Sequence, residues 1–254
     1  MRTEKFDAVH DIVKRNAAIA LAAQSSARIV ELKPDGPVSS IDIEIQTRLI
    51  DELEALFPGS FSVAEEMGKG AKFAPTGLCW IIDPIDGTLP YLRGEPYFGV
   101  QVAAAIDGRL VGGWIVCPAL QREAGAWDGV EVNYQLSTST AKIDLRAVVA
   151  SGDFDDAHLA KLRNRTGLVR RNTLSCAVDY LDAVDGHLDA LLYRRTLPWD
   201  HAAGAYLASR AGLSVERWDG SLYAPWSPGE GILVSSPSAL ARARDLLLPP
   251  GDAS

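Results

Sequence analysis

The sequence predicts a mixed α+β protein in which a helical pair with an antiparallel sheet is followed by an α/β lobe. Three observations support this fold class: two helical patterns open the chain, hairpin signals fill its middle part, and strands alternate with helices further on. At 254 residues the chain has enough length for a sizeable core. We expect one domain over residues 1–254, with an N-terminal lobe over 1–144 and a C-terminal lobe over 145–254.

Two helices are expected before the first central strand. The segment Phe6–Val30 is rich in alanine and repeats apolar residues at spacings of three and four, which is typical of one face of a long helix. The segment Lys33–Pro37 contains two prolines and a glycine and should end this helix. Ser39 or Ser40 can cap a second helix that carries Asp42 in its first turn. The buried stripe of this second helix would consist of Ile45, Leu49, Leu53 and Leu56.

Two predicted strands end in acidic residues. Phe61–Ala64 alternates as a short strand and runs directly into Glu65 and Glu66, and the apolar run Leu78–Ile82 runs into Asp83. A strand that ends in this way can deliver carboxylates to the rim of an active site. Glu66 has two interpretations, a solvated surface acid or a residue that supports the site from behind.

The middle of the chain predicts an antiparallel meander. Phe98–Ile106 and Leu110–Val116 flank Asp107-Gly108, which is a strong signal for a tight hairpin turn. Ala124–Trp127, followed by Asp128-Gly129, would extend the meander. The C-terminal lobe is expected to alternate between the two kinds of element. Its predicted strands cover residues 145–150, 188–193, 213–216 and 232–235, and its predicted helices cover 156–163, 177–184, 201–211 and 238–248.

Composition excludes several classes of protein. The formal net charge is -8, since 33 acidic residues outnumber 25 basic ones, and this argues against nucleic acid as the main partner. No apolar run approaches the ~20 residues of a membrane helix, and residues 1–5 lack the apolar core of a signal peptide. We therefore expect a cytoplasmic protein without a membrane partner. Cys79, Cys117 and Cys176 lie far apart without metal-ligand spacing, which favours reduced thiols.

The stretch Trp80–Thr88 begins as an apolar strand and ends in two carboxylates, a glycine and a hydroxyl. Pro84 should stop the strand, so that a tight turn can aim the carboxylates of Asp83 and Asp86 at one point, where their repulsion calls for a cation. Gly87 lets the backbone come close to a ligand, and N–H groups at the start of a following helix would form a phosphate site. Metal and phosphate are therefore expected to meet here.

Three separated pieces of the sequence carry a resemblance to a known family. Glu65-Glu66, the stretch Trp80–Thr88 and the stretch Trp199–Gly204 resemble, in order and rough spacing, the inositol monophosphatase family of Mg²⁺-dependent sugar-phosphate phosphatases. The resemblance extends roughly from Asp42 to the last predicted strand. It implies the family's layered αβαβα sandwich of the sugar phosphatase type.

The resemblance also implies a metal centre. Its first site would use Glu65, Asp83 and the backbone carbonyl of Ile85, and its second would use Asp83, Asp86 and Asp200. Mg²⁺ prefers oxygen ligands and shares its coordination shell with waters and substrate phosphate. The matching residues therefore suit two or three Mg²⁺ ions.

Catalytic and substrate-binding roles follow from the same resemblance. The family's residues that match Asp42, Glu65 and Thr88 orient and deprotonate the attacking water. Asp42 could instead be only a helix-terminal acid, and Thr88 only a helix cap. His201 should point away from Asp200 and serve packing, because neighbours on a helix point in different directions. The implied substrate-binding residues are Asp86, Gly87, Thr88, Ser175, Cys176, Tyr193 and Asp200.

Several positions depart from the family pattern. Leu174 replaces a glycine that is often found there, and Tyr193 occupies the position of a glutamate that contacts ring hydroxyls in inositol-selective members. These departures weaken inositol phosphate as the substrate without touching the metal acids. Arg170-Arg171 and Arg194-Arg195 lie nearby in sequence. A guanidinium that faced the pocket would bind a second anionic group, and a solvated basic face is the alternative.

Together these observations predict an Mg²⁺-dependent phosphomonoesterase that hydrolyses a small phosphorylated polyol, sugar or nucleotide through metal-activated attack of water. Alternative substrates within the family are fructose 1,6-bisphosphate, a 3′-phosphoadenosine nucleotide and histidinol phosphate. An alternative from another class is a regulatory or RNA-associated protein that retains the fold. The resemblance further implies inhibition by lithium and a homodimer.

Overall fold

The computed structural model describes residues 2–33, 36–67, 76–129, 148–150, 157, 159–160, 164, 169–171, 174–226 and 230–247. Its helices include α1 (Arg2–Ala23), α2 (Ser40–Leu56), α3 (Thr88–Leu92), α5 (Cys176–Val184), α6 (Pro198–Arg210) and α7 (Leu240–Leu247). None of these described helices has the length and apolar character that crossing a membrane requires. Cys79, Cys117 and Cys176 are unpaired thiols, as predicted.

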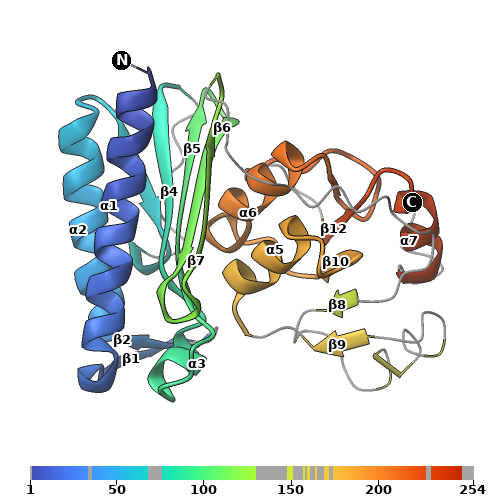
Figure 1. Cartoon of the computed structure of the whole chain (residues 1–254), viewed down its shortest axis with the longest axis horizontal. Helices are drawn as coiled ribbons and strands as arrows, with labels where there is room; N and C mark the ends of the chain where they lie inside the picture. Colours follow the sequence, from blue (N-terminus) through green and yellow to red (C-terminus); the bar gives the residue numbers. More distant parts are fainter. Residues whose placement is uncertain are drawn as a thin grey trace.

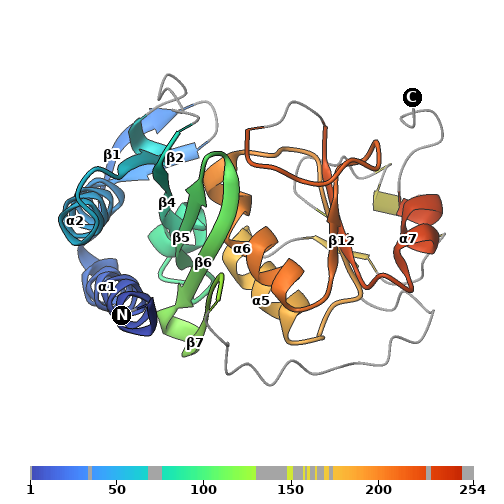
Figure 2. The ribbon, with the colours of Figure 1, turned by 90° about the horizontal axis from the view of Figure 1, so that it is seen from above.

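The elements stack in alternating layers of helices and sheets. Helices α1 and α2 cover one face of the first sheet, and α5 and α6 lie between that sheet and the second one, with α7 on the outer side of the second sheet (Figure 1). The view from above in Figure 2 shows the same order of layers. This order confirms the predicted αβαβα sandwich.

The first helix is shorter than the sequence predicted. α1 ends at Ala23, a 3₁₀ turn follows, and strand β1 (Ile29–Lys33) then pairs antiparallel with β2 (Gly36–Ser39). The β-branched residues Ile29 and Val30 favour an extended backbone over a helical one. The prediction of a helix that continues to Val30 was therefore wrong.

Helix α2 begins with a capping box. The N-cap is Ser39, whose hydroxyl accepts hydrogen bonds from the N–H groups of Ile41 and Asp42 at 3.2 and 3.3 Å. In return, the Ser39 N–H donates to Asp42 Oδ2 at 3.0 Å. The box fixes Asp42 in the first turn, as predicted. The predicted stripe is buried against the sheet at Ile45, Leu49 and Leu53.

The first sheet has the strand order β3-β4-β5-β6-β7. Its strands are β3 (Phe61–Ala64), β4 (Leu78–Asp86), β5 (Gly99–Ile106), β6 (Arg109–Cys117) and β7 (Arg122–Trp127). The predicted hairpin joins β5 to β6 through Asp107 and Gly108, whose φ angles of 50° and 82° suit a tight turn. We expected an antiparallel sheet, but β3 and β4 run parallel and their carboxyl ends meet at one edge.

Both faces of the first sheet are buried. In β4, Trp80 and Ile82 pack toward α1 and α2, whereas Cys79 and Ile81 pack toward α5 and α6. Alternate residues of a strand point to opposite faces, so a sheet covered on both sides needs apolar residues in succession. The apolar run that leads to Asp83 follows from this double burial.

The second sheet has the strand order β11-β12-β10-β8-β9. Its strands are β8 (Val148–Ala150), β9 (Val169–Arg171), β10 (Ala190–Tyr193), β11 (Ser214–Glu216) and β12 (Ile232–Ser235). Four of these strands were predicted, and β9 was not. The helix predicted over 156–163 lies largely outside the described residues.

Helix α6 packs closely against its neighbours on both sides. A Cβ atom at Gly204 would lie 2.2 Å from the ring of Tyr180 in α5. A Cβ at Gly113 in β6 would lie 2.8 Å from the carbonyl oxygen of Ala203. The small residues Ala202, Ala203 and Gly204 therefore permit this close packing. α6 begins at Pro198, earlier than predicted, and this places Asp200 inside its first turn.

Candidate active site

Asp83 and Asp86 lie at the end of β4, where the strand contains a bulge. Asp83 pairs with Gln101 and Asp86 pairs with Gly99, so three steps along β4 match two steps along β5. Residues three apart on a regular strand point to opposite faces, whereas one inserted residue turns both toward the same face. Pro84 does not stop the strand as predicted. It lies inside the bulge, where its missing N–H donor is tolerated.

Two further carboxylates reach the same edge from other elements. Glu65 directly follows β3, which runs parallel to β4, so it leaves its strand beside Asp83. Asp200 comes from the first turn of α6. Its backbone carbonyl accepts a hydrogen bond from Nε2 of Gln101 in β5 at 3.2 Å. Three separate segments thus place four carboxylates together.

A cleft with a volume of about 260 Å³ lies at these carboxylates. Its acidic lining consists of Glu65, Glu66, Asp83, Asp86 and Asp200, and its basic lining consists of Lys33 and Arg195. Other lining residues from the predicted site are Ile85, Gly87, Thr88, Cys176 and Tyr193. The structure therefore brings most of the predicted site residues to one cavity.

Burial and mutual repulsion raise the pKa values of this acidic cluster. Burial raises the pKa of Glu65 well above its ordinary value, and the carboxylates of Asp200 and Glu66 add to the effect. The pKa of Asp83 is also raised, first by burial and then by Glu65 and Asp86. A divalent cation among these oxygens would relieve the repulsion.

One oxygen of Asp83 gives a second indication of a cation. Asp83 Oδ1 is buried and has no hydrogen-bond partner within the part of the chain that the structure describes. A buried polar group without a partner costs on the order of 1–3 kcal/mol, and more when it is charged. Coordination to Mg²⁺, which prefers oxygen ligands, would satisfy this atom. The residues present therefore fit Mg²⁺, and the role of Asp83 as bridging ligand stays a prediction.

Thr88 and Asp42 lie in contact beside this cluster. Thr88 Oγ1 lies 3.2 Å from Asp42 Oδ1 and 3.0 Å from the carbonyl oxygen of Ile85. Burial raises the pKa of the Asp42 carboxyl to about 6, and hydrogen bonds from Ser39 oppose the shift. Asp42 thus combines two arrangements that the sequence left as alternatives, because Oδ2 closes the helix cap while Oδ1 meets Thr88.

Asp86 is held against the N-terminus of α5. Its Oδ1 accepts a hydrogen bond from the N–H of Cys176 at 3.1 Å, and its Oδ2 accepts from the N–H of Ala177 at 2.7 Å and from the hydroxyl of Ser175. Burial raises the pKa of Asp86 to about 6, and these hydrogen bonds oppose the shift. Ser175 is 1% exposed, so its hydroxyl serves Asp86 and does not face the cleft as its predicted role in substrate binding would require.

Gly87 joins the bulge to α3 at a position that requires glycine. Its φ of +86° lies in the left-handed region, and a Cβ atom would meet the carbonyl oxygen of Tyr97 at 2.7 Å and Cβ of Ser175 at 3.0 Å. The absence of a side chain lets this segment lie directly against the start of α5. The close approach that the structure describes is to the protein's own elements, and the approach of a ligand to Gly87 stays a prediction.

Comparison with known proteins identifies the family. The family model described as the inositol monophosphatase family matches residues 4–247. The chain belongs to the inositol monophosphatase family. The inositol-1-monophosphatase of Mycobacterium leprae is 31% identical over 241 residues, which cover 87% of this chain and 81% of that protein.

Two further relatives belong to Thermotoga maritima. Its fructose-1,6-bisphosphatase/inositol-1-monophosphatase is 30% identical over 190 residues, which cover 72% of each protein. A solved structure of a Thermotoga maritima IMPase has a TM-score of 0.82 at 22% identity and covers 97% of both chains, which is a likeness of fold. Membership of the inositol monophosphatase family identifies the chain as a metal-dependent phosphoric monoester hydrolase.

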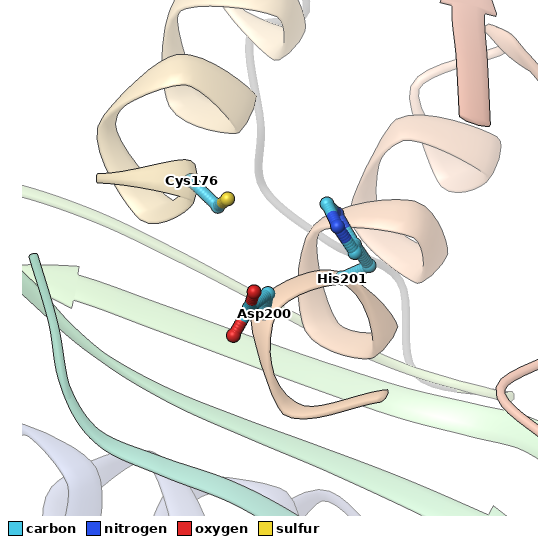
Figure 3. A group of neighbouring side chains, drawn as sticks. All are labelled: Cys176, Asp200 and His201. Atoms are coloured by element: carbon cyan, nitrogen blue, oxygen red, sulfur yellow. The ribbon is translucent and has the colours of Figure 1, made fainter. Parts of the chain in front are cut away.

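A second group of adjacent side chains consists of Cys176, Asp200 and His201 (Figure 3). The atoms of these residues that could ligate a metal lie within 4.8 Å of one another. Nε2 of His201 lies 3.0 Å from the carbonyl oxygen of Arg195, which can only accept, so Nε2 carries the proton. Nδ1 then accepts from the hydroxyl of Tyr180 at 3.3 Å. Both ring nitrogens are engaged, so His201 is not placed to ligate a metal.

The environment of His201 agrees with the packing role that we predicted. Figure 3 shows the side chains of Asp200 and His201 leaving α6 in different directions. Burial lowers the pKa of His201 to about 3, so the imidazole is neutral at physiological pH. The ring packs against Tyr180 and Tyr193.

The two positions that depart from the family have specific environments. The hydroxyl of Tyr193 donates to Oδ2 of the buried Asp179 at 2.8 Å, so it is directed into the protein. Leu174 has a φ of +65°, in the left-handed region that favours glycine, which accounts for the glycine that the resemblance implies there. Its side chain is 44% exposed and lines the cleft.

The sequence did not predict an ion pair that lies on the wall of the cleft. The side chain of Glu66 is 3% exposed and pairs with Lys33 at the end of β1, while its backbone N–H donates to Oε1 of Gln46 at 2.9 Å. Glu66 is therefore not a solvated surface acid. Sequence could not find this pair, because Lys33 was expected where a helix ends and not on a strand beside the cleft.

The four arginines near the site separate into different groups. Arg195 lines the cleft, whereas Arg194 is exposed and lies outside its lining. Arg170 and Arg171 belong to β9, and their side chains lie outside the described part of the structure. The expectation of an arginine at the pocket therefore applies to Arg195.

Proposed function

We propose that the chain is an Mg²⁺-dependent phosphomonoesterase that converts a small phosphorylated polyol, sugar or nucleotide to an alcohol and inorganic phosphate. The observation that carries this proposal is the convergence of Glu65, Asp83, Asp86 and Asp200 on one cleft, with raised pKa values at the first three. A relative named inositol-1-monophosphatase supports the same reaction class.

The metal ligands of this proposal come from the acidic cluster. Glu65, Asp83 and the carbonyl oxygen of Ile85 would hold one ion, and Asp83, Asp86 and Asp200 would hold another, with room for two or three ions in total. Mg²⁺ supplies, when bound, a Lewis acid that activates water and neutralises charge on the phosphoryl group. The buried Asp83 oxygen is the feature of the chain that fits this role most directly.

Asp42, Thr88 and Glu65 would act on the attacking water. The raised pKa of Asp42, about 6, is close to neutral pH and suits a general base. The Thr88 hydroxyl lies between Asp42 and the carbonyl of Ile85, so it can donate to either and orient a water that donates back to it. Proton removal is thus assigned to the buried carboxylates and orientation to the hydroxyl.

The substrate would lie along the cleft from α3 to β10. Its phosphate would meet Asp86, Gly87, Thr88 and Asp200, and its alcohol part would meet Cys176 and Tyr193. Ser175 would act by holding Asp86 in position, because its hydroxyl donates to that carboxylate.

A phosphate-release screen tests this function. The panel contains inositol 1-phosphate, fructose 1,6-bisphosphate, 3′-phosphoadenosine 5′-phosphate, histidinol phosphate and glycerol 2-phosphate, each with Mg²⁺ and with EDTA. We expect at least one compound to be hydrolysed rapidly with Mg²⁺ and not with EDTA. Uniformly low release from every compound would favour the regulatory or RNA-associated alternative.

Four further properties complete the proposal. A single domain is supported by the shared core, in which Val63 and Ile81 of one lobe join a cluster with Leu191 and Val234 of the other. Lithium inhibition and a homodimer rest on the family resemblance, and a cytoplasmic location rests on the sequence. Phosphate release with LiCl, light scattering of the purified chain and cell fractionation test these three properties.

A further inference from the structure

Two exposed leucines line the cleft beside the predicted position of the phosphate. Leu89, in the first turn of α3, is 42% exposed, and Leu174, which directly precedes the N-cap of α5, is 44% exposed. Both residues belong to the lining of the cleft. The carbonyl oxygen of Leu174 would lie 3.3 Å from a Cβ atom at Gly87, which is two positions before Leu89. The two leucines therefore come from segments that adjoin at Gly87.

The backbone conformation of Leu174 is unfavourable for a leucine. Its φ of +65° lies in the left-handed region, where the Cβ atom crowds the following carbonyl oxygen. Glycine or asparagine adopts this conformation more readily. Because Leu174 is largely exposed, its side chain gains little from burial in the core to offset that cost. A leucine at this position is therefore explained better by contact with a molecule in the cleft than by the stability of the fold.

The hydroxyl groups on the same wall of the cleft are directed into the protein. The hydroxyl of Ser175 donates to Asp86, and the hydroxyl of Tyr193 donates to Oδ2 of Asp179 at 2.8 Å. Cys176, which follows Ser175, lines the cleft with a thiol that behaves as a small apolar group. A hydroxyl-rich group placed against this wall would lose hydrogen bonds to water, whereas an apolar group would lose none and would bury apolar surface.

We propose that Leu89 and Leu174 form a contact surface for an apolar group in the alcohol part of the substrate. The chain would then prefer phosphomonoesters that carry an alkyl group beside the ester bond over fully hydroxylated ones of the same size. This inference rests on the proposed function, because a phosphate beside Gly87 determines which wall of the cleft the alcohol part meets. The free energy of the contact comes from apolar surface that is removed from water.

Two matched compounds isolate the polarity of the alcohol part. In pentan-3-yl phosphate, methyl groups replace the two terminal hydroxyl groups of glycerol 2-phosphate, so the two compounds have the same carbon-to-phosphate connection and similar size. We expect the wild type with Mg²⁺ to have a kcat/KM for pentan-3-yl phosphate that is about fivefold higher. The hydroxyl groups make glycerol the better leaving group, so this preference cannot come from the intrinsic reactivity of the ester.

Leu174→Asn and Leu89→Asn each replace an apolar side chain by a polar one of similar size. Each variant should lower the ratio of kcat/KM for pentan-3-yl phosphate to that for glycerol 2-phosphate about fivefold. Asparagine tolerates the left-handed backbone of Leu174, so this variant should fold like the wild type. The matched control is Leu222→Asn, because Leu222 is 79% exposed and lies outside the cleft lining. An unchanged ratio in either cleft variant, or an equal fall in Leu222→Asn, would overturn the inference.

Binding separates this inference from the proposed function. If the wild type hydrolyses neither compound, calorimetric titration of both compounds in the presence of Mg²⁺ decides the role of the leucines. Binding of pentan-3-yl phosphate that is about fivefold tighter than that of glycerol 2-phosphate, with the difference lost in Leu174→Asn and kept in Leu222→Asn, supports the inference. Equal binding of the two compounds by the wild type, or no measurable binding of either, contradicts it. Low release from the panel and from pentan-3-yl phosphate, with the binding preference present, refutes the proposed phosphatase function alone.

Discussion

The hydroxyl of Thr88 lies 3.2 Å from Oδ1 of Asp42, which is 46 positions earlier in the chain. Thr88 is the first residue of α3 and Asp42 lies in the first turn of α2, so the contact joins two helix starts at the end of β4. Asp42 also closes its own capping box. Asp42 therefore has both a structural contact and a proposed catalytic one, so its role cannot be assigned from its position in the helix alone.

Removal of the Thr88 hydroxyl tests its proposed role. Thr88→Val keeps the shape of the side chain and removes the donor to Asp42, so kcat should fall by about 100-fold with little change in KM. Steady-state phosphate release measures both constants. The control is Thr47→Val on the exposed side of α2, where the hydroxyl donates to the Ile43 carbonyl. Wild-type kcat in Thr88→Val would refute the assignment.

Removal of the Ser175 hydroxyl should weaken metal binding. The hydroxyl donates to Asp86 and also caps α5 by accepting from the N–H of Val178. Its hydrogen bond lowers the pKa of Asp86, so Ser175→Ala should raise that pKa and weaken Mg²⁺ affinity about tenfold. Loss of the cap should also cost about 1 kcal/mol of unfolding free energy.

Titration calorimetry with Mg²⁺ and urea unfolding measure these two effects in Ser175→Ala. Ser175→Thr keeps the hydroxyl and should restore both properties. Unchanged Mg²⁺ affinity in Ser175→Ala, together with the loss of stability, would mean that Ser175 caps α5 without supporting the metal site.

The acidic cluster should make the stability of the metal-free protein depend on pH. The folded-state pKa values of Asp42 and Asp86, about 6, lie above the ordinary value of 3.8. Between these values the folded state binds more protons than the unfolded state, so the contribution of these acids to stability falls as pH rises toward 6. For each unit by which the pKa in the folded state exceeds the pKa in the unfolded state, the free energy of unfolding falls by about 1.4 kcal/mol as pH rises across this range.

Mg²⁺ should reverse this loss, because it replaces the protons. The rise in Tm on adding Mg²⁺ should therefore be larger at about pH 7.5 than at about pH 5. His201 has the opposite effect on stability. Its pKa is lowered from 6.5 to about 3 in the folded state, so its contribution to the free energy of unfolding is lost as pH falls below 6.5. Comparison of Mg²⁺ with EDTA at each pH removes this background. Equal Tm shifts at both pH values would contradict the account.

The packing of α6 against α5 leaves no room for a methyl group at Gly204. A Cβ there would lie 2.2 Å from the Tyr180 ring, so Gly204→Ala should cost about 1–3 kcal/mol of unfolding free energy. Urea unfolding measures this cost. A second variant, Gly204→Ala with Tyr180→Leu, should lose less than the sum of its parts because the clash is shared. Strict additivity would show that the ring is not what excludes the methyl.

Local signals in the sequence were sufficient for much of the fold. The cap of α2 near Ser39, the Asp107-Gly108 turn and the apolar run of β4 each depend on neighbouring residues, and each was predicted, with Ser40 as the alternative cap. The acids of the site were also found, because each ends a strand or begins a helix in a recognisable motif. The sequence over-extended the first helix, since the alanine pattern continued to residues that pair as a strand.

The remaining features depend on contacts between distant segments. The bulge at Pro84 is defined by register against β5, and the parallel pairing of β3 with β4 depends on the path between them. Ser175 serves Asp86 because α5 begins directly beside the bulge. The position of Arg195 at the cleft depends on the anchoring of the chain after β10. None of these relationships has a signal within a short window of sequence.

The most direct test of the metal-centred account is Mg²⁺-stimulated phosphate release by Asp83→Asn, measured on the panel compound that the wild type hydrolyses fastest. Asp51→Asn, which changes an exposed acid on α2, is the control and should match the wild type. We expect Asp83→Asn to remain folded by circular dichroism and its phosphate release to fall to the level without enzyme. Wild-type release by folded Asp83→Asn in the presence of Mg²⁺ would contradict the account.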